Sequence, residues 1–319
     1  MIVLWVGFIV FIIMLLALDL GVFNKRAHVI GVKEAIYWSI FWISLALLFI
    51  PVIYLIYGDH LMGAGLSLGS ELNGHQAAVQ YLTGYLIEKT LSLDNIFVIA
   101  IIFNYFNVPA MYQHRVLFWG ILGAILLRGI MIGAGAILIA KFFWMNYAFG
   151  ALLIFTAIKM LKSSDHKIEP NKNPLVKLAR KIYPITNDYH EEHFFIKENH
   201  KKYATPLFIA LLVVEGSDVM FAVDSIPAIF AITKDPFIVF SSNIFAILGL
   251  RSLYFALAAM IDKFVYLKYS LFVILFYVGI KMIVVHHFEI SAMVSLVIIL
   301  FILVAGVVAS MYKSESKTS

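Results

Sequence analysis

The sequence contains nine long runs of apolar residues, each about as long as a helix that crosses a lipid bilayer. Such a helix needs about 20 largely apolar residues. The mean hydropathy of the 319-residue chain is +0.94, and 13% of its residues are charged, whereas soluble domains carry about 25%. We therefore predict an all-α polytopic membrane protein with about nine transmembrane helices, at residues 1–22, 33–57, 77–104, 114–140, 144–162, 205–232, 237–261, 266–286 and 290–311.

Lysine and arginine are distributed unevenly among the loops between these runs. Of the 24 basic residues, 18 lie in alternate loops and the C-terminal tail, which would share one side, and the opposite loops hold only Lys141 and Lys234. Because cytoplasmic loops are enriched in basic residues, we expect the N-terminus outside and the C-terminus in the cytoplasm. The first run is followed by Lys25 and Arg26, the reverse of a signal peptide, so we expect it to be retained.

The single long hydrophilic stretch, 163–203, is expected to be a cytoplasmic loop within one transmembrane domain that covers 1–319. Residues 174–183 have the pattern of a short amphipathic helix at the membrane surface. Its membrane-facing residues would be Leu175, Leu178, Ala179 and Ile182, with Lys177, Arg180 and Lys181 at the lipid headgroups.

Two parts of the sequence match each other when one is shifted by about 122–130 residues. The aligned pairs are Glu88 with Asp218, Asp94 with Asp224, Arg128 with Arg251 and Lys159 with Lys281. The first copy covers the three predicted helices of 77–162, and the second covers those of 205–286. With an odd number of predicted helices between their starts, the copies would be inverted. Inverted repeats of this kind are common in secondary transporters, whose binding sites lie near the bilayer midplane.

Acidic residues inside the predicted helices are the main functional indication. Each isolated charge at the bilayer centre costs about 2.5–3.5 kcal/mol on insertion scales. The acids are Glu88, Asp94, Glu215, Asp218 and Asp224. The bases available to balance their charges are Lys89, Arg128 and Arg251. Because the acids outnumber the bases, we expect a divalent cation, with protons on the remaining carboxylates.

The candidate ligands are mostly oxygen atoms. Asn95 stands beside Asp94, the chain has no cysteine, and no histidine is near these acids. Oxygen ligands suit Mg²⁺, Ca²⁺ or Mn²⁺ better than Zn²⁺ or Cu⁺. Further candidates are Asp19, Ser225 and Met220, whose thioether would favour Mn²⁺.

The spacing of the acids predicts a break in two helices. Six residues turn a straight helix by about 240°, so Glu88 and Asp94 would point in different directions. We therefore expect local unwinding in 77–104 and in 205–232, where Pro227 removes a backbone hydrogen bond and Gly216-Ser217 loosens the chain.

Long motifs spread over residues 1–312 indicate a known family. They are Asp19-Leu-Gly-Val-Phe-Asn24, Thr83-Gly-Tyr-Leu-Ile-Glu-Lys-Thr-Leu-Ser-Leu-Asp-Asn-Ile-Phe97, Gln113-His-Arg-Val-Leu-Phe-Trp-Gly120, the segment from Glu215 to Pro227, and that from Ser242 to Arg251. The chain resembles the TerC/Alx family of integral membrane proteins. The resemblance implies manganese export across the bacterial inner membrane. It also implies that the acids of both repeats bind the ion, here Glu88, Asp94, Glu215, Asp218 and Asp224, with Asn95 beside them.

Export of a divalent cation against an inside-negative potential needs a driving force of about 4.6 kcal/mol per 100 mV. We expect this to come from proton antiport. Two alternatives stay open, a proton-coupled calcium exchanger and a non-transporting factor for membrane-protein assembly. We expect no enzymatic activity, because no acid has a catalytic spacing to a histidine or nucleophile. The expected partners are the lipid bilayer, a divalent metal ion and protons, with no organic cofactor and no nucleic acid.

Overall fold

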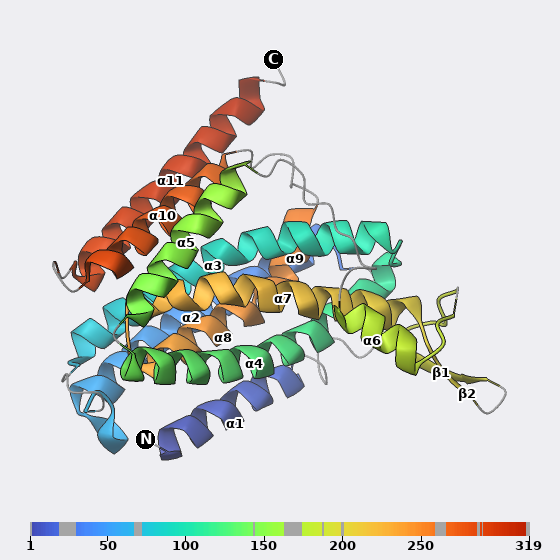
Figure 1. The fold of residues 1–319 in the computed structure, drawn as a ribbon, viewed down its shortest axis with the longest axis horizontal. Helices are drawn as coiled ribbons and strands as arrows, with labels where there is room; N and C mark the ends of the chain where they lie inside the picture. Colours follow the sequence, from blue (N-terminus) through green and yellow to red (C-terminus); the bar gives the residue numbers. More distant parts are fainter. Residues whose placement is uncertain are drawn as a thin grey trace.

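The computed structural model of the chain is dominated by helices (Figure 1). It describes residues 2–18, 30–66, 72–142, 144–162, 174–186, 188–198, 201–258, 266–285, 288 and 290–316. The α-helices are α1 (Ile2–Leu18), α2 (Val32–Gly58), α3 (Gly74–Tyr105), α4 (Ala110–Lys141), α5 (Met145–Lys162), α6 (Pro174–Ile182), α7 (Pro206–Phe230), α8 (Pro236–Leu248), α9 (Leu250–Ala258), α10 (Leu267–Val284) and α11 (Ala292–Ser316). A 3₁₀ turn, η2 (Leu61–Gly63), follows α2, and strands β1 (Phe195–Glu198) and β2 (Lys201–Ala204) form an antiparallel hairpin before α7.

Several helices are long and apolar enough to cross a membrane. Among the described residues, five segments meet this condition, and they are Val32–Gly58, Ala110–Lys141, Pro206–Phe230, Pro236–Leu257 and Ala292–Ser310. Shorter apolar helices are Ile2–Leu18, Met145–Leu161 and Tyr269–Val284. Large apolar side chains such as Leu48, Leu126 and Phe301 are exposed on the outside of the bundle, as expected for contact with lipid. The prediction of an all-α membrane protein is thus confirmed.

The helices form two groups. In Figure 1, α5, α10 and α11 lean together across the molecule, while α1, α2, α3, α4, α7 and α8 run alongside one another. Within the leaning group, Gly150 of α5 meets Gly279 and Ile283 of α10, and Gly279 in turn meets Ile154. The two helices run antiparallel (Figure 1). The two glycines let their backbones approach closely.

Helix α8 lies at the centre of the larger group. All of its residues from Phe237 to Leu248 are buried, which is the expected state of a helix that is apolar on every side. Helix α1 covers one side of it with a stripe spaced four residues apart, Phe8, Ile12 and Leu16. The ring of Phe8 packs edge-on to that of Phe237, with ring centroids 5.3 Å apart.

The predicted unwinding of two helices is wrong. Helix α3 is continuous over 32 residues, and α7 is continuous over 25 residues with Pro227 inside it. Pro227 lies three residues before the end of α7, so the hydrogen bond that it removes belongs to the last turn and the helix does not break. The predicted helix 237–261 is instead divided at Gly249 into α8 and α9.

Helix α6 and the β-hairpin stand together at one end of the molecule (Figure 1). Val176 and Ala179 are buried and pack in the same apolar cluster as Leu207 and Ala210 of α7. The prediction that Ala179 faces the membrane is therefore wrong, because this residue packs against protein. Leu175, Leu178 and Ile182 are exposed.

Candidate cation-binding cavity

Arg128 of α4 joins acidic side chains from two helices. Its Nε and Nη2 donate to the two carboxylate oxygens of Asp218 on α7, at 3.2 and 2.9 Å. Its Nη1 donates to Glu88 Oε1 on α3. The same nitrogen lies 2.6 Å from Asn243 Oδ1 and 3.3 Å from Ser225 Oγ. One guanidinium, 1% exposed, thus connects the two acids that the sequence alignment pairs with each other.

Beside this ion-pair network lies a cavity of about 340 Å³, which we call the central cavity. It is enclosed by α3, α4, α5, α7 and α10, so it lies between the two helix groups. Its polar and charged lining consists of Glu88, Asn95, Arg128, Thr156, Lys159, Asp224 and Ser225. Three of the main predicted ligand residues, Glu88, Asn95 and Asp224, therefore share one cavity with the further candidates Ser225 and Met220.

The oxygens around the central cavity differ in their hydrogen bonds. Asp224 Oδ1 accepts a hydrogen bond from Thr156 Oγ1 at 2.9 Å. Glu88 Oε2 and Asn95 Oδ1 are buried and have no hydrogen-bond partner among the residues that the structure describes. Buried polar atoms in native proteins are nearly always paired, so on this cavity these two oxygens are the atoms most in need of a further partner. A cation is one such partner.

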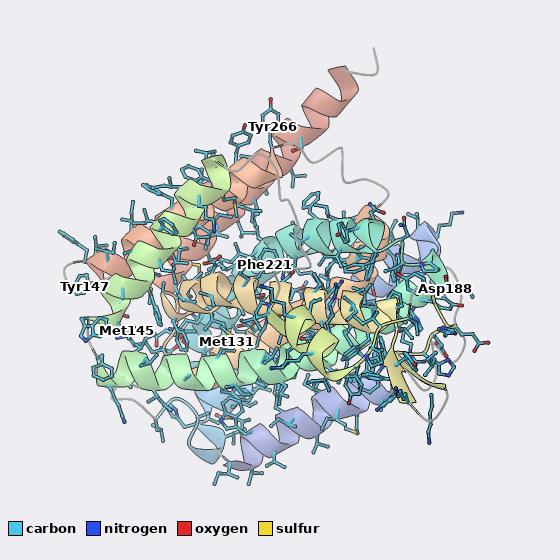
Figure 2. All side chains as sticks on the ribbon, turned by 45° about the vertical axis from the view of Figure 1, so that its right-hand side comes forward. Met131, Met145, Tyr147, Asp188, Phe221 and Tyr266 are labelled. Atoms are coloured by element: carbon cyan, nitrogen blue, oxygen red, sulfur yellow. The ribbon has the colours of Figure 1, made fainter. Side chains whose placement is uncertain are left out.

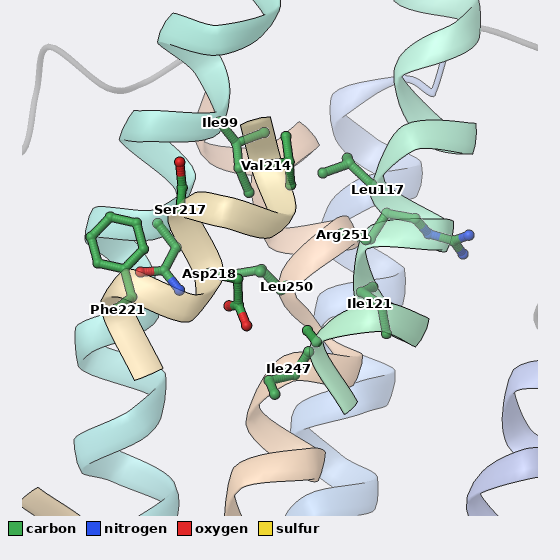
Figure 3. Close-up of a pocket in the computed structure, with 13 residues that line it drawn as sticks. Ile99, Leu117, Ile121, Val214, Ser217, Asp218, Phe221, Ile247, Leu250 and Arg251 are labelled. Carbon is green, nitrogen blue, oxygen red and sulfur yellow. The ribbon is translucent and has the colours of Figure 1, made fainter. Parts of the chain in front are cut away.

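Asp218 also faces a smaller cavity of about 30 Å³, close to the space of one water molecule. Asn95 and Phe221 line both this cavity and the central one, so the two are neighbours. Figure 2 places Phe221 near the middle of the molecule. In the close-up of Figure 3, the Asp218 carboxylate lies between Phe221 and Leu250, whereas the Arg251 guanidinium points away from it. Arg251 is buried and lines the smaller cavity.

Glu215 stands apart from the central cavity. It lies on α7 one turn before Asp218, and its carboxylate packs directly against Gly123 of α4. Its Oε2 is buried and has no hydrogen-bond partner in the described part of the chain. The structure therefore does not place this acid with Glu88 and Asp224.

Three other predicted residues have specific surroundings. Lys89 donates to the backbone carbonyl of Ala246 at 3.2 Å and is not ion-paired with a described carboxylate. Ser225 is buried beside Arg128, and Met220 lines the central cavity with 67% of its surface exposed. Asp19 and the side chain of Asp94 lie outside the part of the chain that the structure describes.

In the described part of the chain, no three histidine, aspartate or glutamate side chains are close enough to hold one metal ion. The metal-binding roles of the acids therefore stay predictions. The sequence analysis also missed Asn243 and Thr156, which bond to Arg128 and Asp224. The available signal was that both are polar residues within apolar predicted helices.

Comparison with known proteins gives consistent matches along the chain. The model of the integral membrane protein TerC family matches residues 73–318. The "Uncharacterized membrane protein STKORF319" of Myxococcus xanthus is 51% identical over 312 residues, 98% of this chain and 93% of the relative. The "Putative membrane-bound redox modulator Alx" of Escherichia coli K12 is 47% identical over 304 residues, 94% and 92% of the two chains. An "Uncharacterized membrane protein" of Rickettsia felis is 44% identical over 311 residues, 98% of each chain. No solved structure matches.

Proposed function

The chain belongs to the TerC family of integral membrane proteins, and from this premise we propose that it exports Mn²⁺ across the bacterial inner membrane in exchange for protons. The observation that carries the proposal is the pair of buried, unpartnered oxygens, Glu88 Oε2 and Asn95 Oδ1, on the cavity that Asp224 also lines. Carboxylate and amide oxygens are suitable ligands for Mn²⁺.

The charge of the site supports a cation as its occupant. Glu88 and Asp218 share the single charge of Arg128, and Asp224 faces the same cavity with Lys159 as the nearby base. Three carboxylates thus stand against two bases, and a bound cation or a proton would balance the remaining negative charge. We propose that antiport depends on exchange between a cavity that holds the cation and a cavity that holds protons.

We further propose nine transmembrane helices arranged as an inverted repeat, with the N-terminus outside. The antiparallel packing of α5 and α10 supports this arrangement, because they are the third helices of the two copies. Arg128 supports it as well, since it binds Glu88 from one copy and Asp218 from the other. A central cavity between two helix groups could be opened to alternate sides if the groups rock against each other.

The name of the Escherichia coli relative suggests another class of function, redox chemistry. This chain contains no cysteine, so it has no thiol that could exchange electrons. We therefore propose ion transport and no enzymatic or redox activity. Because the oxygens of the central cavity also suit Ca²⁺, competition between Mn²⁺ and Ca²⁺ for uptake measures the selectivity.

Transport by purified protein in liposomes is the direct test. We expect Mn²⁺ flux that is accelerated by an opposing pH gradient, and a flux indifferent to that gradient would contradict antiport. Asp224→Asn removes a negative charge from the central cavity at nearly constant size, and we expect it to abolish the flux. Normal transport by this variant would refute the assignment of the site.

The matched control is Asp188→Asn, the same chemical change in the exposed segment at the far end of the molecule (Figure 2). It should transport as the unchanged protein does. Binding is measured separately from transport by the shift in thermal unfolding. Mn²⁺ at about 100 times its dissociation constant should stabilise the unchanged protein by about 2.7 kcal/mol, and this effect should disappear in Asp224→Asn.

A further inference from the structure

A third cavity lies at the end of the molecule opposite α6 and the β-hairpin. It has a volume of about 550 Å³ and is formed where α3, α5 and α11 begin and where α7 and α10 end. We call it the end cavity. In Figure 2, Met145 and Tyr147 mark this end of the molecule, and Asp188 marks the other.

The charged groups of the end cavity differ in kind from those of the central cavity. They are Lys281 on α10, with Lys234 and Asp235 between α7 and α8. Asp235 is occupied as the N-cap of α8, where its Oδ1 accepts from the backbone N–H groups of Phe237 and Ile238. The only other titratable side chain on the lining is that of His75. With a neutral His75 the formal charge of the lining is positive.

Lys281 is the buried basic group of this cavity. It is 4% exposed, and its Nζ donates to Ser295 Oγ of α11 at 2.8 Å. The Tyr277 hydroxyl lies 3.0 Å from the same Oγ, so one hydroxyl group bonds the ammonium and a second supports the first. No carboxylate in the described residues is within ion-pair distance of Nζ. A cavity of this size has room for several water molecules.

The repeat-equivalent lysine has a different environment. Lys159, which the sequence aligns with Lys281, is exposed and lines the central cavity together with Asp224. Each lysine therefore shares its cavity with a carboxylate, but Asp235 is engaged as the N-cap of α8, and the end cavity also holds Lys234. The lining of the end cavity is thus formally more positive than that of the central cavity, where Glu88 and Asp224 balance Arg128 and Lys159.

The end cavity belongs to the outer side in the proposed topology. The described part of the basic segment between α5 and α7, which includes α6 and the β-hairpin, lies at the opposite end, and basic loops are cytoplasmic. Resting on the proposed function, we propose that Lys281 is an electrostatic barrier to external divalent cations, which lowers the affinity of the outer pathway for Mn²⁺ and prevents its return. A divalent cation is repelled twice as strongly as a monovalent one at the same distance.

The test measures Mn²⁺ entry from the end-cavity side only. Because the chain has no cysteine, Asp188→Cys, exposed at the opposite end of the molecule, provides a single reactive thiol in every variant. At about one molecule per liposome, an impermeant biotin–thiol reagent and avidin beads then remove the liposomes in which this end faces outward. In the remaining molecules, we expect Lys281→Met to lower the KM for external Mn²⁺ about tenfold or more. Lys281→Arg, which keeps the charge, should stay near the unchanged value.

Three controls separate charge from structure. Ser295→Ala removes the hydrogen bond of Lys281 and keeps its charge, so the KM should not change. Lys141→Met neutralises an exposed base that does not line the end cavity, and the KM should stay within about twofold. Met293→Lys adds a charge to the lining and should raise the KM, which keeps the test valid even if Lys281→Met does not fold.

Three negative outcomes are distinguishable. Unchanged protein that carries no Mn²⁺ in either direction would overturn the proposed function and this inference together. Normal transport by the unchanged protein, with the same KM in Lys281→Met and Met293→Lys, would overturn the electrostatic barrier alone. A KM that falls equally in Ser295→Ala would also overturn it, because the effect would then follow the packing and not the charge.

Discussion

Arg128 is the residue on which the centre of the molecule depends. It is buried and satisfies two carboxylates at once. Removing one partner of a buried ion pair leaves uncompensated charge and typically costs about 3–5 kcal/mol. We expect Arg128→Met to destabilise the protein by about this amount, measured by thermal unfolding in detergent. Arg115→Met is the control, because its pair with Glu192, 3.0 Å apart, is at the surface and should contribute less than about 1 kcal/mol. Equal losses in both variants would contradict the structural role of Arg128.

Gly123 is required by the position of the Glu215 carboxylate. A Cβ atom added at Gly123 would overlap that carboxylate, whereas one added at Gly133 of the same helix meets nothing within 4 Å. We expect Gly123→Ala to cost about 1–3 kcal/mol of stability, and Gly133→Ala to be neutral or slightly stabilising. Adding Glu215→Ala to Gly123→Ala should restore most of the loss. A stable Gly123→Ala would show that Glu215 does not pack there.

The sequence alone was enough to find the acids within the helices, because a charge within an apolar run is recognisable without any knowledge of the fold. It was not enough to predict which base pairs with which acid. That Arg128 binds both Glu88 and Asp218 depends on where α3, α4 and α7 meet, which spacing along one helix cannot show. Lys89 illustrates the same limit, since its partner is a backbone carbonyl 157 positions away.

The packing of α5 on α10 makes a prediction at the scale of elements. A Cβ at Gly150 would be 2.8 Å from the carbonyl oxygen of Gly279 and 2.7 Å from Ile283 Cγ1. Because a backbone atom cannot move aside as a side chain can, we expect Gly150→Ala to separate the helices and cost about 1–3 kcal/mol in thermal unfolding. Gly7→Ala on α1, with nothing within 4 Å, is the control. Equal stability of the two variants would contradict this close contact.

Helices were predictable from the apolar runs, but their interruptions were not. The run 237–261 contains no proline or charge before Arg251, yet the helix divides at Gly249. A Cβ there would be 3.1 Å from Trp42 Cβ on α2, so the glycine allows a close approach between two helices. In α7 a break was predicted that does not occur. Pro227 lies in the last turn of the helix, and a proline breaks a helix only when more of the helix follows it.

At the scale of the whole molecule, the larger cavities lie between the two helix groups. The central cavity is bounded by α5 and α10 on one side and by α3, α4 and α7 on the other. The end cavity is bounded by the start of α11 and the end of α10 on one side and by α3 and α7 on the other. Relative motion of the groups would therefore change both cavities together, which is what alternating access requires.

The proposed orientation in the membrane rests on the distribution of the basic residues, and single substitutions can test it. Because the sequence lacks cysteine, a single cysteine reports the location of any position. Lys141 at the end of α4 should be outside and Asp188 near the β-hairpin should be cytoplasmic. In intact cells, an impermeant thiol reagent should label Lys141→Cys at once and Asp188→Cys only after permeabilisation. The reverse pattern would invert the topology and place the end cavity, with Lys281, on the cytoplasmic side, where it could not limit the return of exported cations.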